Sequence, residues 1–154
     1  MMRLFIVVVF IVVNFLALAI GGAYTSDGIS SDWYQELNKA PWTPPGWMFG
    51  VAWTTIMIFF SFYMANLYRF GKSRILIFGL FLLQWVLNVV WNPIFFYFRN
   101  VEFGLVVILC LTGIVGVFLF KYYNLLKLRS LFIVPYFLWL IIASSLNYYI
   151  YLYN

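Results

Sequence analysis

The composition of this chain is typical of a membrane protein. Of its 154 residues, 66% are apolar and 8% are charged, and the net charge is +5. Soluble domains carry about 25% charged residues, so this much apolar surface requires lipid. The chain has no histidine, and its four carboxylates lie outside the apolar runs, which argues against an intramembrane metal site, acid/base hydrolysis and ion-coupled transport. The nine Lys and Arg residues occupy short connectors rather than one face, so no nucleic-acid partner is expected.

Five apolar stretches are long enough to cross a bilayer, which takes about 20 mainly apolar residues. They cover residues 4–22, 48–68, 75–98, 103–123 and 131–153. The first stretch is longer than the core of a signal peptide, so we interpret it as a retained helix. We therefore predict an all-α membrane protein, with residues 1–154 forming one domain: a five-transmembrane-helix bundle with a long ordered loop between helices 1 and 2.

The cations are unevenly divided between the two sides of this bundle. Arg3, Arg69, Lys72, Arg74, Lys121, Lys127 and Arg129 fall on one side, whereas Lys39 and Arg99 fall on the other. Loops on the inner side of a membrane are enriched in Lys and Arg. We predict that the N terminus lies inside, and that the C terminus and the first connector lie outside.

The first connector, residues 23–47, is too long and too aromatic for a plain turn. It contains Trp33 and Tyr34, followed by the segment APWTPPG at 40–46, where the prolines fix φ and remove backbone donors. Two interpretations remain open. The segment is either an interfacial aromatic belt or a lid that folds over the bundle, since long ordered connectors are often binding loops.

Three of the stretches carry polar and aromatic residues at spacings that place them on one helix face. Uncharged amides in hydrocarbon are costly unless paired, so the amides should face other helices. They either join helices by hydrogen bonds worth about 0.6 to 2 kcal/mol each, or help to line a cavity for a flat, mostly apolar ligand. The stripes are Gln84, Asn88, Trp91 and Phe95 in the third stretch, Tyr136, Trp139, Ala143 and Asn147 in the fifth, and Phe49, Trp53, Ile56 and Phe60 in the second.

Prolines and glycines modify this pattern. Pro93 and Pro135 fall inside the third and fifth stretches, where each removes a backbone hydrogen bond. By default we interpret them as ordinary transmembrane prolines, and the alternative is a kink that opens room between helices. Gly113 and Gly116 in the fourth stretch permit close helix approach, so a homodimer is a further expectation that the sequence leaves open.

Taken with their flanks, these residues resemble four motifs of the TspO/MBR family, the tryptophan-rich sensory proteins of bacteria and the mitochondrial translocator protein, also called the peripheral benzodiazepine receptor. The motifs occur in the family's order and cover nearly the whole chain. The matching segments are Trp33-Tyr34 with Lys39-Ala-Pro-Trp-Thr-Pro-Pro45, Gly50-Val-Ala-Trp53, Gln84-Trp-Val-Leu-Asn88-Val-Val-Trp91-Asn-Pro-Ile-Phe-Phe96, and Pro135-Tyr136-Phe-Leu-Trp139 with Leu146-Asn147-Tyr148-Tyr149.

The resemblance implies a five-helix bundle, often dimeric and surrounded by membrane lipid, with a ligand pocket beneath the first connector. Family members bind porphyrins such as protoporphyrin IX and drug-like isoquinoline or benzodiazepine ligands, and no cofactor or metal is implied. The ligand-binding residues expected here are Trp42, Phe49, Trp53, Gln84, Asn88, Trp91, Tyr136, Trp139, Ala143 and Asn147, with Lys39 and Arg99 as anchors for the porphyrin propionates.

Three functions are consistent with these features. The first is a membrane receptor or sensor that binds a tetrapyrrole and aids its transport or disposal. The second is an enzyme that degrades protoporphyrin IX oxidatively in light, with Trp53 and Trp139 as the catalytic residues. The third is a scaffold that binds only protein partners. The chain departs from the family at Val107, where an Asp is common, and at Phe103, where a tryptophan is common.

Overall fold

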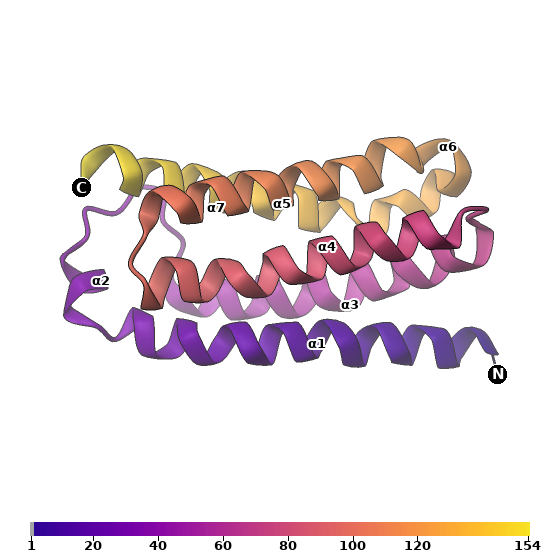
Figure 1. Ribbon diagram of the computed structural model, residues 1–154, viewed down its shortest axis with the longest axis horizontal. Coiled ribbons are helices and arrows are strands. Elements are labelled where there is room, and N and C mark those ends of the chain that lie inside the picture. The colour runs from indigo at the N-terminus through magenta and orange to yellow at the C-terminus, as the bar shows by residue number, and fades with distance from the viewer. Residues whose placement is uncertain (1) are drawn as a thin grey trace.

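The computed structural model describes residues 2–154 and the side chains of residues 4–154, so the side chain of Arg3 lies outside the described part. The described chain is helical, with no strand. Five long helices run along the same axis, and short helical segments join them (Figure 1). The elements are α1 (Met2–Ile29), α2 (Asp32–Glu36), α3 (Gly46–Phe70), α4 (Arg74–Asn92), the π-helical η1 (Pro93–Tyr97), α5 (Val101–Lys121), α6 (Tyr123–Leu126), the 3-10 helix η2 (Lys127–Phe132) and α7 (Val134–Tyr153).

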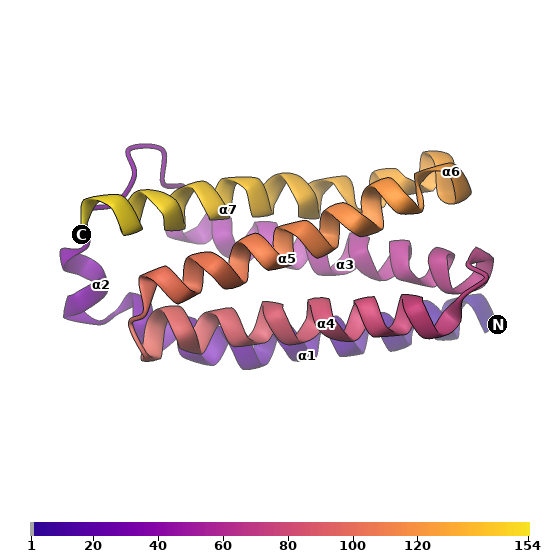
Figure 2. The ribbon, with the colours of Figure 1, turned by 45° about the horizontal axis from the view of Figure 1, so that its top comes forward.

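The long helices form a closed ring rather than two flat layers. Helix α1 packs against α3 and α4, α4 packs against α5, α5 packs against α7, and α7 packs against α3. Helices α4 and α7 therefore face each other across the interior. Figures 1 and 2 show the N terminus and α6 at one end of the ring, which we call the α6 end. The C terminus and α2 lie at the other, which we call the connector end.

The helices have the length and composition of membrane spans, which confirms the predicted all-α membrane bundle. Four segments qualify singly: Leu4–Ile29, Gly46–Phe70, Arg74–Tyr97 and Val101–Lys121. The fifth is a pair of segments, Tyr123–Phe132 and Val134–Tyr153, bent by 73°. The predicted stretch 131–153 therefore begins too early, because residues 131 and 132 belong to η2, on the far side of the bend.

The first helix continues beyond the apolar run that predicts it. Hydropathy marks only the part of a helix that needs lipid, whereas the backbone hydrogen bonds of α1 continue as far as Ile29. At about 1.5 Å per residue, its 28 residues exceed the roughly 30 Å of hydrocarbon in a bilayer. The connector is correspondingly shorter than predicted, because α3 already begins at Gly46 after an extended Pro45.

The two prolines act differently from each other. Pro135 is in the first turn of α7. The N–H groups of a first turn have no acceptor within the helix, so this proline removes no helical hydrogen bond and does not interrupt α7. Pro93 begins the π-helical η1 at the end of α4, so the winding changes where the proline removes a donor. Within η1, three successive side chains are buried: Ile94, Phe95 and Phe96.

Candidate functional site

Two hydrogen bonds cross the ring between α4 and α7. Gln84 Nε2 donates to Tyr136 Oη at 2.8 Å, and Trp91 Nε1 donates to Asn147 Oδ1 at 3.1 Å. The Asn147 amide also donates from Nδ2 to the carbonyl of Val101, at 3.1 Å, which ties in the start of α5. The stripes predicted on α4 and α7 therefore do face each other, and two of their amides join helices.

Aromatic rings from α3 line the same interior. The Trp53 ring meets Tyr136 edge to face with centroids 5.9 Å apart, and Phe49 meets Trp139 in the same way at 5.4 Å. Such pairs contribute about 0.5 to 1.5 kcal/mol beyond their buried area. The half-buried side chain of Ala143 packs against the same cluster. The three predicted stripes thus meet in one place, which we call the interior site.

Several polar groups of the interior site lack a partner among the described residues. The indole Nε1 of Trp139 and the Oε1 of Gln84 are both buried without a hydrogen bond. The side-chain amide of Asn88, a residue only 8% exposed, also forms none within the described chain. Burying an unpaired donor or acceptor costs about 1 to 3 kcal/mol. The interior site therefore has unused donors and acceptors beside aromatic faces.

Unpaired buried atoms are not confined to this site, because Tyr122 Oη and Ser130 Oγ at the α6 end are also without partners. What distinguishes the interior site is the set of tryptophan rings around its unpaired atoms. Among residues 4–154, no Asp, Glu, Lys or Arg is buried. The arrangement is therefore suited to binding by stacking and neutral hydrogen bonds.

On the side that faces the α6 end, the interior site is closed by a densely packed core. Tyr136 contacts Trp53 on one side and Phe60 on the other, with the Tyr136 and Phe60 centroids 5.3 Å apart. Beyond Phe60 follow Tyr63 and Phe118, and all three are fully buried. Tyr136 therefore marks the boundary between the interior site and this core.

On the side of the interior site that faces the connector end, the connector lies over the bundle, and its helix α2 makes the contacts. Ser31 caps α2 by accepting a hydrogen bond from the Tyr34 backbone N–H. The Trp33 ring packs on Phe95 at 5.7 Å and Tyr34 packs on Phe96 at 5.5 Å. Phe95 in turn stacks on Trp91 at 5.1 Å. Burial of Tyr34 raises the pKa of its phenol, which keeps it neutral. These contacts form a continuous path from α2 to the interior site, as expected of a packed lid.

The remaining predicted residues lie away from the interior contacts. Trp42 is 54% exposed, donates from Nε1 to Ser145 Oγ at 3.2 Å and meets the edge of Tyr149, so it packs on α7. The two predicted propionate anchors lie on neighbouring rings of α2. Lys39 Nζ is 4.6 Å from the Tyr34 centroid, and the Arg99 guanidinium is 5.8 Å from that of Trp33.

Sequence reasoning missed two contributors to this site. The carbonyl of Val101 accepts from Asn147, but a backbone acceptor has no signature in residue type. Phe96 is buried beside Phe95 because π-helical winding turns adjacent residues inward, which spacings of three and four do not predict. Pro93 is the one available signal for that change of winding.

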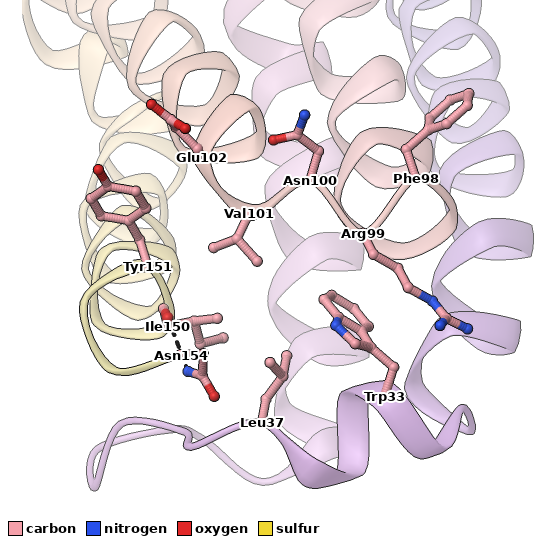
Figure 3. Close-up of a pocket in the computed structure, with 10 residues that line it drawn as sticks. All are labelled: Trp33, Leu37, Phe98, Arg99, Asn100, Val101, Glu102, Ile150, Tyr151 and Asn154. Carbon is pink, nitrogen blue, oxygen red and sulfur yellow. Dashed lines mark hydrogen bonds between the residues drawn. The ribbon is translucent and has the colours of Figure 1, made fainter.

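Two pockets stand out in the described part of the chain, and neither is lined by Trp53, Asn88 or Trp139. One, of about 480 Å³, opens at the connector end (Figure 3). The other, of about 540 Å³, is an apolar groove between α5 and α7 that includes Gly113, Gly116 and Phe137. Because the rings of the interior site contact one another, a large ligand has to move them apart to enter.

Comparison with known proteins supports the same reading of the motifs. A sequence model of the TspO/MBR family matches residues 7–152. The chain is similar to tryptophan-rich protein TspO of Archaeoglobus fulgidus, at 33% identity over 142 residues that cover 90% of this chain and 91% of that protein. Protein CrtK of Rhodobacter capsulatus is 32% identical over 88% of this chain and 87% of its own length. Translocator protein of Bos taurus is 31% identical over 82% of this chain and 78% of its own.

The chain is also similar to tryptophan-rich sensory protein of Cereibacter sphaeroides, whose name agrees with a role as a membrane sensor. The family match spans all five long helices and the connector, so it covers every element that forms the interior site. With its bundle of long apolar helices and this match over nearly its full length, the chain belongs to the TspO/MBR family and is an integral, multi-pass membrane protein.

Proposed function

We propose that this chain is a membrane receptor that binds a tetrapyrrole, such as protoporphyrin IX, in the interior site. The observation that carries the proposal is the buried indole N–H of Trp139, which has no hydrogen-bond acceptor among the described residues, while the ring itself packs on Phe49. A flat ligand with polar atoms in its ring offers that acceptor while its faces pack on tryptophan. The unpaired Oε1 of Gln84 and the amide of Asn88 offer further contacts.

The proposed entry route is through the connector. Binding moves Phe49 away from Trp139 and Trp53 away from Tyr136, and the ligand then replaces these edge contacts by stacking. Movement of α2 is transmitted to the interior by the contacts of Trp33 with Phe95, and of Phe95 with Trp91. Drug-like isoquinoline or benzodiazepine ligands, being flat and mostly apolar, would compete for the same space.

The propionates of the porphyrin are assigned to Lys39 and Arg99, the two cations of the connector end. The unequal division of cations predicts that the N terminus lies inside, and we propose on that basis that this end faces outward and that the ligand enters from the outer side. The same end also carries Asp27, Asp32 and Glu36, so a porphyrin dianion is drawn to these two cations rather than to the end as a whole.

The test is a fluorescence titration of the purified protein in detergent with protoporphyrin IX. Saturable quenching of tryptophan is expected. Trp139→Phe keeps a ring and removes the N–H, so affinity should fall about fivefold, the value of roughly one neutral hydrogen bond. Trp47→Phe is the matched control, because Trp47 is 68% exposed and should leave affinity unchanged. Absence of saturable quenching, as a scaffold for protein partners predicts, would overturn the proposal.

A second candidate, light-dependent oxidation of bound porphyrin with dissolved oxygen as the electron acceptor, is favoured by the edge-to-face contact of Trp53 with Tyr136, which brings two oxidisable rings together. Illumination of the complex separates the two functions. Catalysis predicts loss of the porphyrin spectrum to a defined product, and this loss should be abolished by Trp53→Phe or Trp139→Phe. Equal bleaching in both variants and in free detergent would leave the receptor function alone.

A further inference from the structure

The groove of about 540 Å³ between α5 and α7 lies apart from the interior site and shares no residue with it. Helices α5 and α7 lie side by side, and α5 ends and α7 begins toward the α6 end (Figures 1 and 2). The groove is lined on α5 by residues between Thr112 and Lys121, and on α7 by Phe137, near the start of that helix. It therefore runs along the half of the bundle that leads to the α6 end.

The length of the groove corresponds to one leaflet of a bilayer. The 21 residues of α5 extend over about 31 Å, which matches the roughly 30 Å of hydrocarbon in a bilayer. The segment from Thr112 to Lys121 covers only the second half of the helix, about 14 Å. One acyl chain of a phospholipid fills a leaflet of this depth. A helix of a second copy would instead lie along both leaflets.

The groove is closed toward the middle of the membrane. Thr112 marks its end, and the hydroxyls of Thr112 and Ser144 are joined by a hydrogen bond of 3.2 Å that holds α5 to α7. On the same face of α5, Val106 and Leu109 follow in the other half of the helix, 49% and 53% exposed. Bulky side chains thus fill the space beyond the groove, so an occupant enters from the α6 end and stops near the midplane.

Two glycines and two phenylalanines shape the space inside the groove. A Cβ added at Gly116 would lie 3.3 Å from Cε2 of Phe137, whereas a Cβ added at Gly113 would meet nothing within 4 Å. The Phe120 ring meets Phe137 edge to face at 5.8 Å and is 70% exposed. In lipid, association depends on van der Waals packing rather than on the hydrophobic effect. A slender acyl chain packs beside Gly113 and against these rings.

A single cation stands at the open end of the groove. Lys121 is the one charged residue among the described residues that line it. It is the last residue of α5, where a long side chain reaches the level of the lipid head groups. All four carboxylates of the chain belong to the connector end, so none is available to pair with Lys121. The other cations of the α6 end add to the attraction of an anionic head group.

From these features we infer that the groove binds one acyl chain of an anionic phospholipid, whose phosphate pairs with Lys121. The depth of the groove selects a lipid chain over a helix of a second copy, and the charge selects the head group. A zwitterionic lipid also carries a phosphate, but it brings an ammonium to an end that already has an excess of cations. The inference does not depend on which ligand the interior site binds.

The experiment measures which lipid the full-length protein retains. The protein is reconstituted in nanodiscs with equal amounts of phosphatidylglycerol and phosphatidylcholine of identical acyl chains, extracted with mild detergent and analysed by native mass spectrometry. The wild type should retain phosphatidylglycerol in preference. Lys121→Gln should lower this preference about threefold, as for a partly exposed ion pair. Gly113→Leu should abolish the retention of both lipids, because the new side chain occupies the open space beside residue 113.

Matched controls make the same changes outside the groove. Lys72→Gln removes a cation from the same end, and Gly79→Leu adds a side chain to α4, where an added Cβ also meets nothing within 4 Å. Both should leave the retained lipids unchanged. All four residues are exposed, so the variants should keep the wild-type unfolding temperature.

Three outcomes would overturn the inference. The first is a wild type without a preference for phosphatidylglycerol, and the second is an effect of the controls as large as that of the groove variants. The third is read from the same mass spectra, which also report the oligomeric state. If Gly113→Leu converts a dimer to a monomer and leaves lipid retention unchanged, the groove holds a second copy of the chain rather than a lipid.

Discussion

The two halves of α3 differ in a way that separates the densely packed core of this bundle from the proposed binding site. Between residues 56 and 67, nine of the twelve residues are buried, whereas between 46 and 55 every residue is exposed or half-buried. The C-terminal half, from residue 56, belongs to the dense core around Phe60 and Tyr63. The N-terminal half supplies Phe49 and Trp53 to the interior site. One continuous helix thus serves as core at one end and as the wall of a site at the other.

The charges follow the same division. In the whole sequence the α6 end carries seven cations and no carboxylate, and the connector end carries two cations and four carboxylates. These counts correspond to net charges of +7 and −2, which sum to the +5 of the chain. The densely packed end is therefore the one that carries the excess of cations, and the end at which we propose that ligands enter has a net charge of only −2.

The largest expected effect tests this division in the core. Phe60→Ala removes a fully buried ring that contacts Tyr63, Phe81, Phe118 and Tyr136. We expect a loss of about 3 to 5 kcal/mol in the free energy of unfolding. Thermal unfolding in detergent, followed by circular dichroism, measures the change.

Phe49→Ala is the matched variant in the other half, where the same ring is only half-buried. It should cost less than half as much, because less of its surface leaves solvent on folding. Equal losses for the two variants would show that both halves are equally packed and would remove the basis of the comparison.

The next effect tests a tightly packed contact at the connector end, between α1 and η1. A Cβ added at Gly28 would lie 2.3 Å from Cδ1 of Phe96, so Gly28→Ala must displace a buried ring. We expect about 1 to 3 kcal/mol of destabilisation. At Gly22, in the same helix, an added Cβ meets nothing within 4 Å. Gly22→Ala should be neutral or stabilising, and the same unfolding assay compares the two.

A smaller effect is expected at Tyr136, which marks the boundary between the interior site and the core. Tyr136→Phe removes the acceptor of Gln84 Nε2 and keeps the ring in place against Phe60 and Trp53. The loss should be about 1 kcal/mol, the value of an interhelical hydrogen bond in a membrane. In the double variant with Gln84→Leu, the second substitution should cost almost nothing more. Additive losses would mean that the two side chains do not act together.

The last test concerns the division of charges between the two ends and uses cysteine labelling. Its substitutions should have the smallest effect on stability. In a Cys110→Ala background, Ser30→Cys marks the connector end and Ser73→Cys marks the α6 end. With the N terminus inside, a membrane-impermeant maleimide added to intact cells should label residue 30 at once, and residue 73 only after permeabilisation. The reverse order would contradict the predicted orientation.

Much of the bundle could be predicted from the sequence, because hydropathy reports directly which segments need lipid. The spacings of Gln84, Asn88 and Trp91 on α4, and of Tyr136, Trp139 and Asn147 on α7, also predicted inward faces, since an amide in hydrocarbon requires a partner. Their pairing across the ring follows from those faces. These features depend on local composition and periodicity, which a sequence contains.

Other features were decided only by tertiary structure. The sequence left open whether the helix bends at Pro135, and the structure places the bend of 73° before α7, so that the proline stands in a first turn. The π-helical turn after Pro93 and the left-handed backbone of Arg99 arise where α4 reaches α1, α2 and α5. The unpaired nitrogen of Trp139 is likewise a property of its neighbours. Composition and periodicity thus determined the helices and their inward faces, whereas the winding at the helix ends and the satisfaction of each polar atom depended on long-range contacts.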